Sequence, residues 1–435
     1  MKVLILIIYL RNEDKKLTFK MIWIYTIGVT LFTIVTKIAS LFHQKAKLFN
    51  EGRKNVFNEI QIKINANDRP IWFHFASLGE FEQGRPVLEC IKLKYPTEKI
   101  VITFFSPSGF EIRKNYAGAD GIFYLPIDTL ANAKRFIDLV NPQLAIFTKY
   151  EFWFNYFNEL HAKHIPLYLI SGIFRPNQAF FKWYGEFYRK MLACVTHFFV
   201  QNEESVLLLN GIGITEVSLS GDTRFDRVFE NAASPKKITE VEAFCGDSPV
   251  FIAGSTWLAD EKILISLTEK QRDWKFIIAP HEVDEGHIQE IERLFSNSTR
   301  FSVLSSKLTA HQIPNSKLQT LIIDNIGMLS SLYQYGTIGY IGGGFGVGIH
   351  NTLEAAAFGL PVIFGPKYDK FQEAKDLIAI GAAKSVATEA ELITAFEHFT
   401  ANEKAAANAK DYVEKKRGAT EKIINMILPS LPKLQ

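Results

Sequence analysis

The chain has 435 residues, which is enough for two α/β domains because single hydrophobic cores stop growing well below that length. Its formal net charge of +3 is too small to indicate a nucleic-acid-binding protein. The three cysteines, Cys90, Cys194 and Cys245, are widely spaced and odd in number. They form no metal-ligand or disulfide pattern, and this suits a reducing compartment.

An apolar segment near the N-terminus, residues 21–42, is about as long as a helix that crosses a bilayer. Its one charged residue, Lys37, lies near an end and can reach the head groups. We expect residues 21–42 to form a single-pass membrane anchor helix, preceded by a tail of residues 1–20. A signal peptide is the alternative, but no small-residue cleavage site clearly follows the segment. Lysines flank it on both sides, so the positive-inside rule does not fix its orientation.

Beyond the anchor, predicted strands alternate with predicted helices, and glycine-rich or polar loops follow the strands. This order predicts two doubly wound, Rossmann-like α/β domains that face a cleft. We expect an N-terminal acceptor-side domain at 43–231 and a polar linker at 232–247. A C-terminal nucleotide-binding domain at 248–410 and a helix within 411–435 that packs back across the domains complete the expected organisation.

The first predicted strand of the N-terminal domain, residues 71–76, ends in Ser77-Leu78-Gly79-Glu80. Glu80 is therefore expected on a loop at the carboxyl end of a strand, where open α/β sheets bind ligands. A carboxylate near a helix start can instead serve only to stabilise the helix dipole. The residues alone leave both roles open.

A later segment, residues 172–190, interleaves bulky aromatic residues with basic ones. This combination suits a membrane interface and a phosphorylated glycolipid. A core helix with a solvated basic face explains it about equally well. The candidates for acceptor or membrane contact are Arg175, Lys182, Trp183 and Arg189.

The stretch at 341–366 indicates a strand, a glycine loop, a helix start and a further strand. Glycines let the backbone approach a ligand closely, and free amides at a helix start favour an anion, so a phosphate is expected there. Glu354 is placed to accept hydrogen bonds from vicinal sugar hydroxyls. The alternative is a βαβ corner whose glycines only serve tight turns.

This stretch resembles the nucleotide-binding segment of GT-B glycosyltransferases. Gly342-Gly343 with Asn351-Thr352-Leu353-Glu354 resembles the Kdo (3-deoxy-manno-octulosonic acid) transferases of glycosyltransferase family 30, which move Kdo from CMP-Kdo to lipid A precursors. Ser77-Leu78-Gly79-Glu80 is similar to the family's Ser-Val-Gly-Glu motif, in which the Glu is the catalytic base. The resemblance covers nearly all of residues 71–427, with several motifs in family order.

The resemblance implies that Glu80 is the general base and that Glu151, in Glu151-x-Trp153-x-Asn155, positions the transition state or the acceptor. Lys149 stands where the family has a first Glu, which reverses the charge at that position. Arg224 stands where the family has Lys in Gly-Asn-x-Lys-Phe-Asp. It is expected to neutralise the donor phosphate as CMP leaves.

For the donor, Ala279-Pro280-His281 is similar to the family's Ala-Pro-Arg-His loop. His281 replaces the Arg, so its charge depends on pH. Residues 324–329 resemble the family's Asp-x-x-Gly-x-Leu segment. The residues implied to bind CMP are Pro280, His281, Ile326, Gly327, Met328, Gly342, Gly343, Asn351, Thr352, Leu353 and Glu354.

The implied function is an inverting transfer of Kdo from CMP-Kdo to a lipid A precursor, lipid IVA, in lipopolysaccharide core biosynthesis. The implied location is the cytoplasmic face of the inner membrane, with no cofactor, no metal and no nucleic acid. The chain has no Asp-x-Asp pair, so a metal-dependent site of the other common glycosyltransferase fold is unsupported. Two alternatives stay open: another GT-B enzyme with a different nucleotide-sugar donor, and an inactive, membrane-tethered nucleotide-binding homologue.

Overall fold

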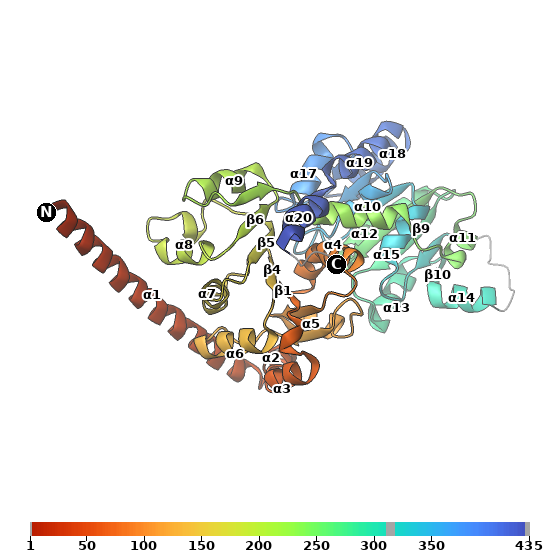
Figure 1. Cartoon of the computed structure of the whole chain (residues 1–435). Helices are drawn as coiled ribbons and strands as arrows, with labels where there is room; N and C mark the ends of the chain where they lie inside the picture. Colours follow the sequence, from red (N-terminus) through yellow and green to blue (C-terminus); the bar gives the residue numbers. More distant parts are fainter. Residues whose placement is uncertain (1, 310–317, 431–435) are drawn as a thin grey trace. The chain divides into compact units, whose positions relative to one another are not determined.

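The computed structural model describes residues 2–309 and 318–430, and the chain forms two compact units, each built on a parallel sheet of seven strands (Figure 1). Unit 1 comprises Met1–Arg224 and Gly418–Gln435, and unit 2 comprises Phe225–Arg417. Helices alternate with the strands in both units, as doubly wound domains require. The predicted pair of Rossmann-like domains is confirmed.

The sheet of unit 1 has the strand order β3-β2-β1-β4-β5-β6-β7. Strand β1 pairs with β2 on one side and with β4 on the other. Every residue of these three strands is buried, as expected where helices cover both faces of a parallel sheet. The strands are β1 (Ile71–Phe75), β2 (Ile100–Phe104), β3 (Gly121–Tyr124), β4 (Leu144–Thr148), β5 (Leu167–Gly172), β6 (His197–Val200) and β7 (Val217–Leu219).

Helix α4 of unit 1 begins earlier than the sequence predicts. Ser77 caps it by accepting a hydrogen bond from the amide of Gly79, so the helix starts at Leu78. Glu80 therefore lies in the first turn of α4 and not on a preceding loop. The helices are α2 (Gln44–Glu51), α3 (Val56–Lys63), α4 (Leu78–Lys94), α5 (Pro107–Arg113), α6 (Leu130–Val140), α7 (Phe154–Ala162), α8 (Glu186–Leu192) and α9 (Glu203–Asn210), with short 3-10 turns η1 (Ala66–Asp68) and η2 (Ala179–Phe181).

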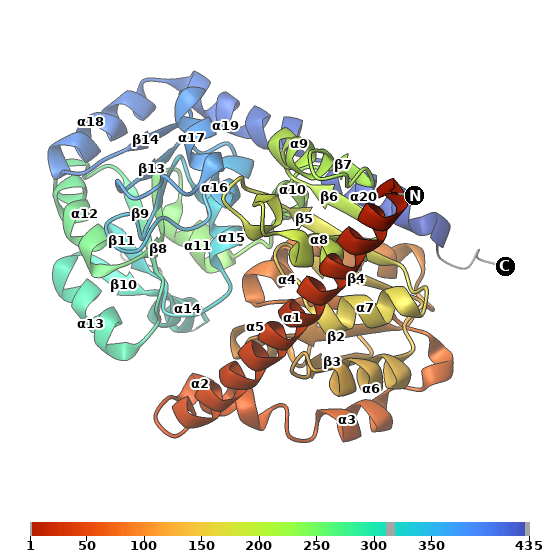
Figure 2. The same cartoon turned by 90° about the vertical axis from the view of Figure 1, so that its left-hand side faces the viewer.

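The N-terminal helix α1 (Lys2–Ala39) is continuous through most of the predicted tail and the predicted anchor. Residues 20–39 of this helix are long and apolar enough to cross a membrane. Residues 40–42, at the end of the predicted anchor, form a turn instead of helix. Figure 2 shows α1 running across unit 1 between α8 and α2.

The sheet of unit 2 has the strand order β10-β11-β9-β8-β12-β13-β14. Strand β12 pairs with β8 and β13, so the loops that follow these three strands lie at one edge of the sheet. The strands are β8 (Val250–Thr256), β9 (Lys275–Pro280), β10 (Ser298–Arg300), β11 (Thr320–Ile322), β12 (Ile338–Ile341), β13 (Val362–Phe364) and β14 (Ala383–Ser385).

The segment expected as a linker, residues 232–247, contains the end of α10 and the whole of α11. Val241 and Phe244 of α11 are buried in the core of unit 2. The helices are α10 (Thr223–Ala233), which begins in the last residues of unit 1, α11 (Thr239–Cys245), α12 (Leu258–Lys270), α13 (Glu285–Leu294), α14 (Phe301–Thr309), α15 (Leu329–Leu332), α16 (Leu353–Ala357), α17 (Gln372–Ala379), α18 (Glu389–Thr400) and α19 (Glu403–Lys416), with the 3-10 turn η3 (Tyr333–Tyr335).

The chain returns to unit 1 at its C-terminal end. Helix α19 belongs to unit 2, and the helical path breaks at Gly418, whose φ of +104° suits glycine. Helix α20 (Ala419–Ile427) and the turn η4 (Leu428–Ser430) follow in unit 1. Ile423, Ile424 and Ile427 are fully buried in the same cluster as Phe73 of β1. The C-terminal helix is thus part of the core of unit 1.

Replacing Ile424 with Ala should lower the free energy of unfolding by about 2–5 kcal/mol, because it leaves a cavity between α20 and the sheet. Urea unfolding followed by circular dichroism measures this change. Met426 lies on the same helix with 43% of its surface exposed, so Met426→Ala is the matched control. Equal midpoints for the two variants would contradict the assignment of α20 to this core.

Candidate active site

Glu80 is held between two polar groups in the first turn of α4. The hydroxyl of Ser77 donates a hydrogen bond to Oε2 of Glu80. The Nζ atom of Lys149, just after β4, lies 3.9 Å from Oε1 of the same carboxylate. Both side chains of the Lys149–Glu80 pair are about a fifth exposed, at 23% and 19%. The carboxylate is therefore oriented by its neighbours and still open to solvent.

Glu151 lies against a buried histidine, His74, which the sequence analysis did not identify as a candidate. Its Oε2 accepts a hydrogen bond from Nε1 of Trp153 (2.9 Å) and lies 3.3 Å from Nε2 of His74. His74 is fully buried, and its Nδ1 lies 2.8 Å from Oγ1 of Thr103. An ionised carboxylate can only accept, so we assign a proton to Nε2 of His74. A histidine inside the otherwise apolar strand β1 was the available sequence signal.

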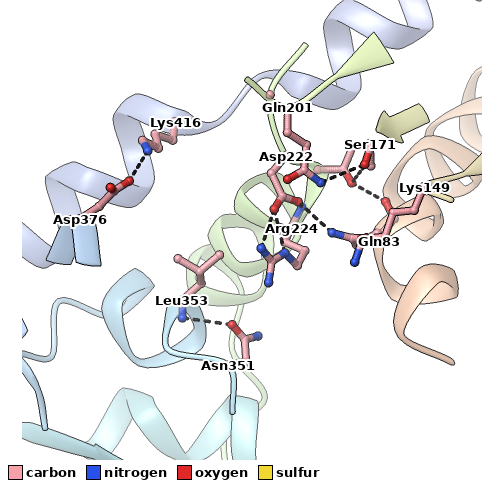
Figure 3. A network of polar contacts seen from close by, with 12 residues as sticks. Gln83, Lys149, Ser171, Gln201, Asp222, Arg224, Asn351, Leu353, Asp376 and Lys416 are labelled. Atoms are coloured by element: carbon pink, nitrogen blue, oxygen red, sulfur yellow. Dashed lines mark hydrogen bonds and ion pairs between the residues drawn. The ribbon is translucent and has the colours of Figure 1, made fainter. Parts of the chain in front are cut away.

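Arg224 is paired inside unit 1. Its Nε and Nη2 lie 2.8 and 2.7 Å from Oδ2 of Asp222, and its amide donates to Oδ1 (2.9 Å; Figure 3). Nε2 of Gln83, on α4, also donates to Oδ1 of Asp222 (3.4 Å). The other end of this amide, Oε1, is buried and accepts no hydrogen bond within the described residues. Asp222 therefore holds the guanidinium of Arg224, and Gln83 of α4 helps to hold Asp222.

The glycines after β12 allow loops to pack backbone against backbone. A Cβ atom on Gly342 would lie 2.3 Å from the carbonyl oxygen of Ser255, near the end of β8. A Cβ on Gly344 would lie 2.5 Å from the Cα of Gly365, after β13. Either contact is far too short, so both positions require glycine. The structural role weighed in the sequence analysis is therefore real at these two residues.

Asp260 organises the same loop from α12. It is buried and accepts hydrogen bonds from the hydroxyl of Tyr340 (2.8 Å) and from the amides of Gly343 (2.9 Å) and Trp257 (3.0 Å). Burial raises the pKa of this carboxyl group, while its hydrogen bonds oppose the rise. The amide of Gly343 is engaged inside the protein, and so is that of Gly342, which donates to a carbonyl of β8. These two amides are therefore not available to a phosphate, and the phosphate expected at the helix start needs other donors.

Three aromatic rings stack beside the glycine loop. The ring of His281 lies 4.2 Å from that of His350 and 4.9 Å from that of Trp257, centroid to centroid. Nε1 of Trp257 donates to Nε2 of His350 (3.3 Å). This acceptor role requires an unprotonated Nε2, and burial with the nearby His281 lowers the pKa of His350 to about 4.

Asn351 shapes the start of α16. Its Oδ1 accepts a hydrogen bond from the amide of Leu353 (3.1 Å; Figure 3), and its Nδ2 donates to Oε1 of Glu354 (3.0 Å). The helix has five residues and begins at Leu353, after His350 and Asn351. Thr352, between Asn351 and Leu353, is buried, and its Oγ1 has no hydrogen-bond partner within the described residues.

The remaining predicted donor residues lie at the carboxyl ends of β9 and β11. Pro280 ends β9, and His281 follows it. Ile326 is 89% exposed, and Gly327 has a φ of +93°, so this turn presents an apolar side chain to solvent. Met328 packs against the core of unit 2.

Some of the side chains predicted to contact the acceptor or the membrane are exposed, and others are held by hydrogen bonds within the protein. Trp183 is 92% exposed, whereas Nη1 of Arg189 donates to the carbonyls of Phe180 (3.0 Å) and Lys182 (3.1 Å). Arg189 therefore holds the turn before α8. The guanidinium of Arg175 lies 6.0 Å from the ring centre of Tyr150, next to Lys149.

Comparisons with known proteins agree with this arrangement. Residues 46–227 match the family model described as 3-deoxy-D-manno-octulosonic-acid transferase. The curated 3-deoxy-D-manno-octulosonic acid transferase of Rickettsia typhi is 25% identical over 83% of this chain and 80% of its own length. That of Haemophilus influenzae is also 25% identical, over 83% of this chain and 87% of its own. This chain is thus similar to Kdo transferases over most of its length, and residues 46–227 match their family model.

Members of the Kdo transferase family are glycosyltransferases, and the fold agrees. The UDP-GlcNAc 2-epimerase of Neisseria meningitidis, solved with UDP-GlcNAc, superposes with a TM-score of 0.58 over 83% of this chain and 100% of that chain, at 18% identity. A second epimerase structure, from Listeria monocytogenes, has a TM-score of 0.55 and 12% identity over 82% of this chain and 95% of that chain. At these identities the likeness shows the shared GT-B fold alone.

The stacked histidines His281 and His350 predict a pH-dependent stability. His350 titrates near pH 4 in the folded chain but near 6.5 when unfolded, so the unfolded state binds more protons between these values. Stability should therefore fall as pH drops from about 6.5 to 4. His350→Asn should remove on the order of 1 kcal/mol of this dependence.

Urea unfolding at several pH values between 4 and 7 measures that difference. The matched control is His398→Asn, because His398 lies exposed on α18 of the same unit. A free-energy difference between wild type and His350→Asn that is constant across this range would contradict the assignment of a neutral His350.

Proposed function

We propose that this chain transfers Kdo from CMP-Kdo to the glucosamine backbone of a lipid A precursor, lipid IVA, with inversion at the anomeric carbon. Similarity to Kdo transferases supports Kdo transfer in lipopolysaccharide biosynthesis. The observation that carries the finer proposal is the carboxylate of Glu80, held by Ser77 and Lys149 at the carboxyl end of β1. It is oriented, partly exposed and able to take a proton.

In the proposed reaction, an acceptor hydroxyl attacks the anomeric carbon of Kdo from the side opposite CMP. Glu80 takes the hydroxyl proton while the bond from the anomeric carbon to the phosphate oxygen breaks. CMP leaves with the bonding electron pair, and the guanidinium of Arg224 is proposed to offset the charge on its phosphate. Asp222 would hold that guanidinium in place between turnovers.

Glu151 has the proposed role of positioning the acceptor or the transition state. Its carboxylate is fixed by Trp153 and His74, and its side chain is 17% exposed. A carboxylate with two fixed donors keeps lone pairs for a sugar hydroxyl without moving. This arrangement supports a positioning role and leaves the proton transfer to Glu80.

CMP is proposed to bind unit 2 at the carboxyl ends of β9, β11 and β12. This edge includes Pro280, His281, the 326–328 turn and Glu354, as the resemblance implies. Oε1 of Glu354 accepts a hydrogen bond from Nδ2 of Asn351, and a carboxylate can accept hydrogen bonds from vicinal hydroxyls of the ribose as well. Because CMP-sugars are made inside the cell, the proposed location is the cytoplasmic face of the inner membrane.

Substituting Glu80 by Gln should lower the transfer rate by roughly a hundredfold to ten-thousandfold, because the amide cannot take the proton. Transfer from CMP-Kdo, generated in situ, to a tetra-acylated lipid A precursor measures this rate. Glu82→Gln is the matched control, since Glu82 lies on the same helix and pairs with Arg85 and Arg113 on the surface. Equal rates for the two variants would exclude Glu80 as the base.

A panel of nucleotides should separate this proposal from its alternatives. We expect CMP to bind at least about tenfold more tightly than UDP or GDP, because a site with fixed hydrogen-bonding groups rejects a base with the wrong pattern. Isothermal titration calorimetry measures the affinities. Preference for UDP or GDP would favour a different GT-B donor, and tight CMP binding without any transfer would favour an inactive homologue.

A further inference from the structure

The N-terminal helix is bonded to the side of unit 1. The hydroxyl of Tyr25 donates to Oδ2 of Asp128 (2.5 Å), in the loop after β3. The same carboxylate accepts the amides of Asn155 and Tyr156 at the start of α7, each at 3.1 Å. The ring of Tyr25 also lies 5.6 Å from that of Phe154. Tyr25 thus completes a polar cluster that belongs to the folded domain.

A second set of contacts lies three helical turns further along α1. Nδ2 of Asn50, on α2, donates to the carbonyl of Thr36 (2.8 Å). The ring of Phe32 lies 5.8 Å from that of Phe49 and 6.0 Å from that of Phe105. Tyr25 and Thr36 are about 16 Å apart along the helix axis. Helix α1 is therefore held against unit 1 at two separate points and cannot pivot about either one.

The opposite face of α1 is exposed and apolar. The large apolar side chains on it have between 48% and 61% of their surface exposed. The hydroxyls along the helix are satisfied locally, since Thr26, Thr30 and Thr33 donate to carbonyls of the preceding turn. These apolar side chains are Trp23, Ile24, Ile27, Leu31, Ile34, Val35 and Ile38, and Leu41 and Phe42 are exposed in the turn that follows α1.

The charges around this face have one sign. Residues 20–50 contain four lysines and no aspartate or glutamate. Lys20, Lys37, Lys45 and Lys47 are all exposed. An apolar face with basic residues beside it matches acyl chains below anionic lipid head groups. The length of the exposed apolar face, together with charges of one sign beside it, is the observation that favours a lipid surface.

A bilayer-spanning position conflicts with the docked contacts. A span would place about 30 Å of helix in hydrocarbon, and the domain surface docked along it would follow. Asp128 and the amide of Asn50 would then enter a region where exposed polar and charged groups are costly. An in-plane position leaves these groups on the aqueous side and still buries the exposed apolar face.

We propose that residues 20–42 bind the anionic surface of a lipid bilayer as an in-plane helix, so that the N-terminus stays on the same side of the membrane as unit 1. This differs from the single-pass anchor that the sequence predicts. The arrangement concerns attachment and does not depend on the transfer reaction, so its test and that of Glu80 succeed or fail separately.

Protease accessibility of tags on the full-length protein decides between the two topologies. The protein carries one epitope tag at each end and is examined in inverted inner-membrane vesicles and in spheroplasts. An in-plane helix predicts that protease removes both tags in inverted vesicles and neither in spheroplasts. Protection of the N-terminal tag in inverted vesicles, with its loss in spheroplasts, would overturn the proposal.

Vesicle flotation of the purified protein tests the lipid face itself. We expect binding to phosphatidylcholine vesicles that contain phosphatidylglycerol, and on the order of tenfold weaker binding for Ile34→Glu. Ile62→Glu is the matched control, because Ile62 is 84% exposed on α3 and lies outside residues 20–42. Retained CMP binding checks that each variant is folded.

Two results of this flotation experiment would overturn the lipid assignment. Equal flotation of wild type, Ile34→Glu and Ile62→Glu is the first. The second is a wild-type protein that does not float and sediments as a dimer that Ile34→Glu dissociates, since the apolar face would then bind a second copy of the chain.

Discussion

Parallel strand pairing determines where the candidate residues of unit 1 lie. Phe73 and His74 of β1 pair with Ile146 and Phe147 of β4, so both strands end at the same level of the sheet. The loops that follow are therefore neighbours, although about 70 residues of chain separate them. This pairing brings Lys149 to within 3.9 Å of Glu80 and sets Glu151 over His74. Any shift of this register would separate all four side chains.

This geometry explains what Lys149 does at the position where the family has a glutamate. Lys149 has a φ of +63°, a conformation that costs a non-glycine residue some energy, and its ammonium group faces Glu80. A partly exposed ion pair contributes little to stability. Its effect is one of orientation, because the ammonium occupies one carboxylate oxygen and Ser77 binds the other. An ionised carboxylate offers about four acceptor sites, so lone pairs of Glu80 remain for the hydroxyl of the proposed acceptor, and Lys149 helps to fix how the carboxylate presents them.

Residue patterns predicted the elements well because strands and helices depend on local spacing. Buried apolar runs located β1, β4 and β12, and the order of strands and helices indicated two doubly wound domains. Contacts between distant residues were not predictable in this way. The hydrogen bond from the amide of Gly343 to Asp260 joins residues 83 positions apart, and that from Tyr25 to Asp128 joins residues 103 apart. Both depend on which loops the sheet order brings together, which periodicity does not encode.

Local chemistry explains the other differences from the sequence predictions. Ser77 can cap α4, which moved Glu80 from a loop into the first turn of the helix. The side chain of Asn351 accepts a hydrogen bond from the amide of Leu353, the residue at which α16 begins. The glycines after β12 allow close approach of loops at Gly342 and Gly344, and the amide of Gly343 donates to Asp260, which lies on another helix.

The proposed in-plane helix also accounts for the aromatic and basic residues before α8. The ring of Phe187, on α8, lies 6.0 Å from that of Tyr25, so α1 and α8 share one side of unit 1. Trp183 and Tyr184, just before α8, are 92% and 52% exposed, and aromatic residues of this kind favour the head-group region. The proposed lipid acceptor would keep its acyl chains in the bilayer while its sugar hydroxyls reach Glu80 in water. A domain that lies with one flank on the membrane would meet both requirements without lifting the acceptor out of the bilayer.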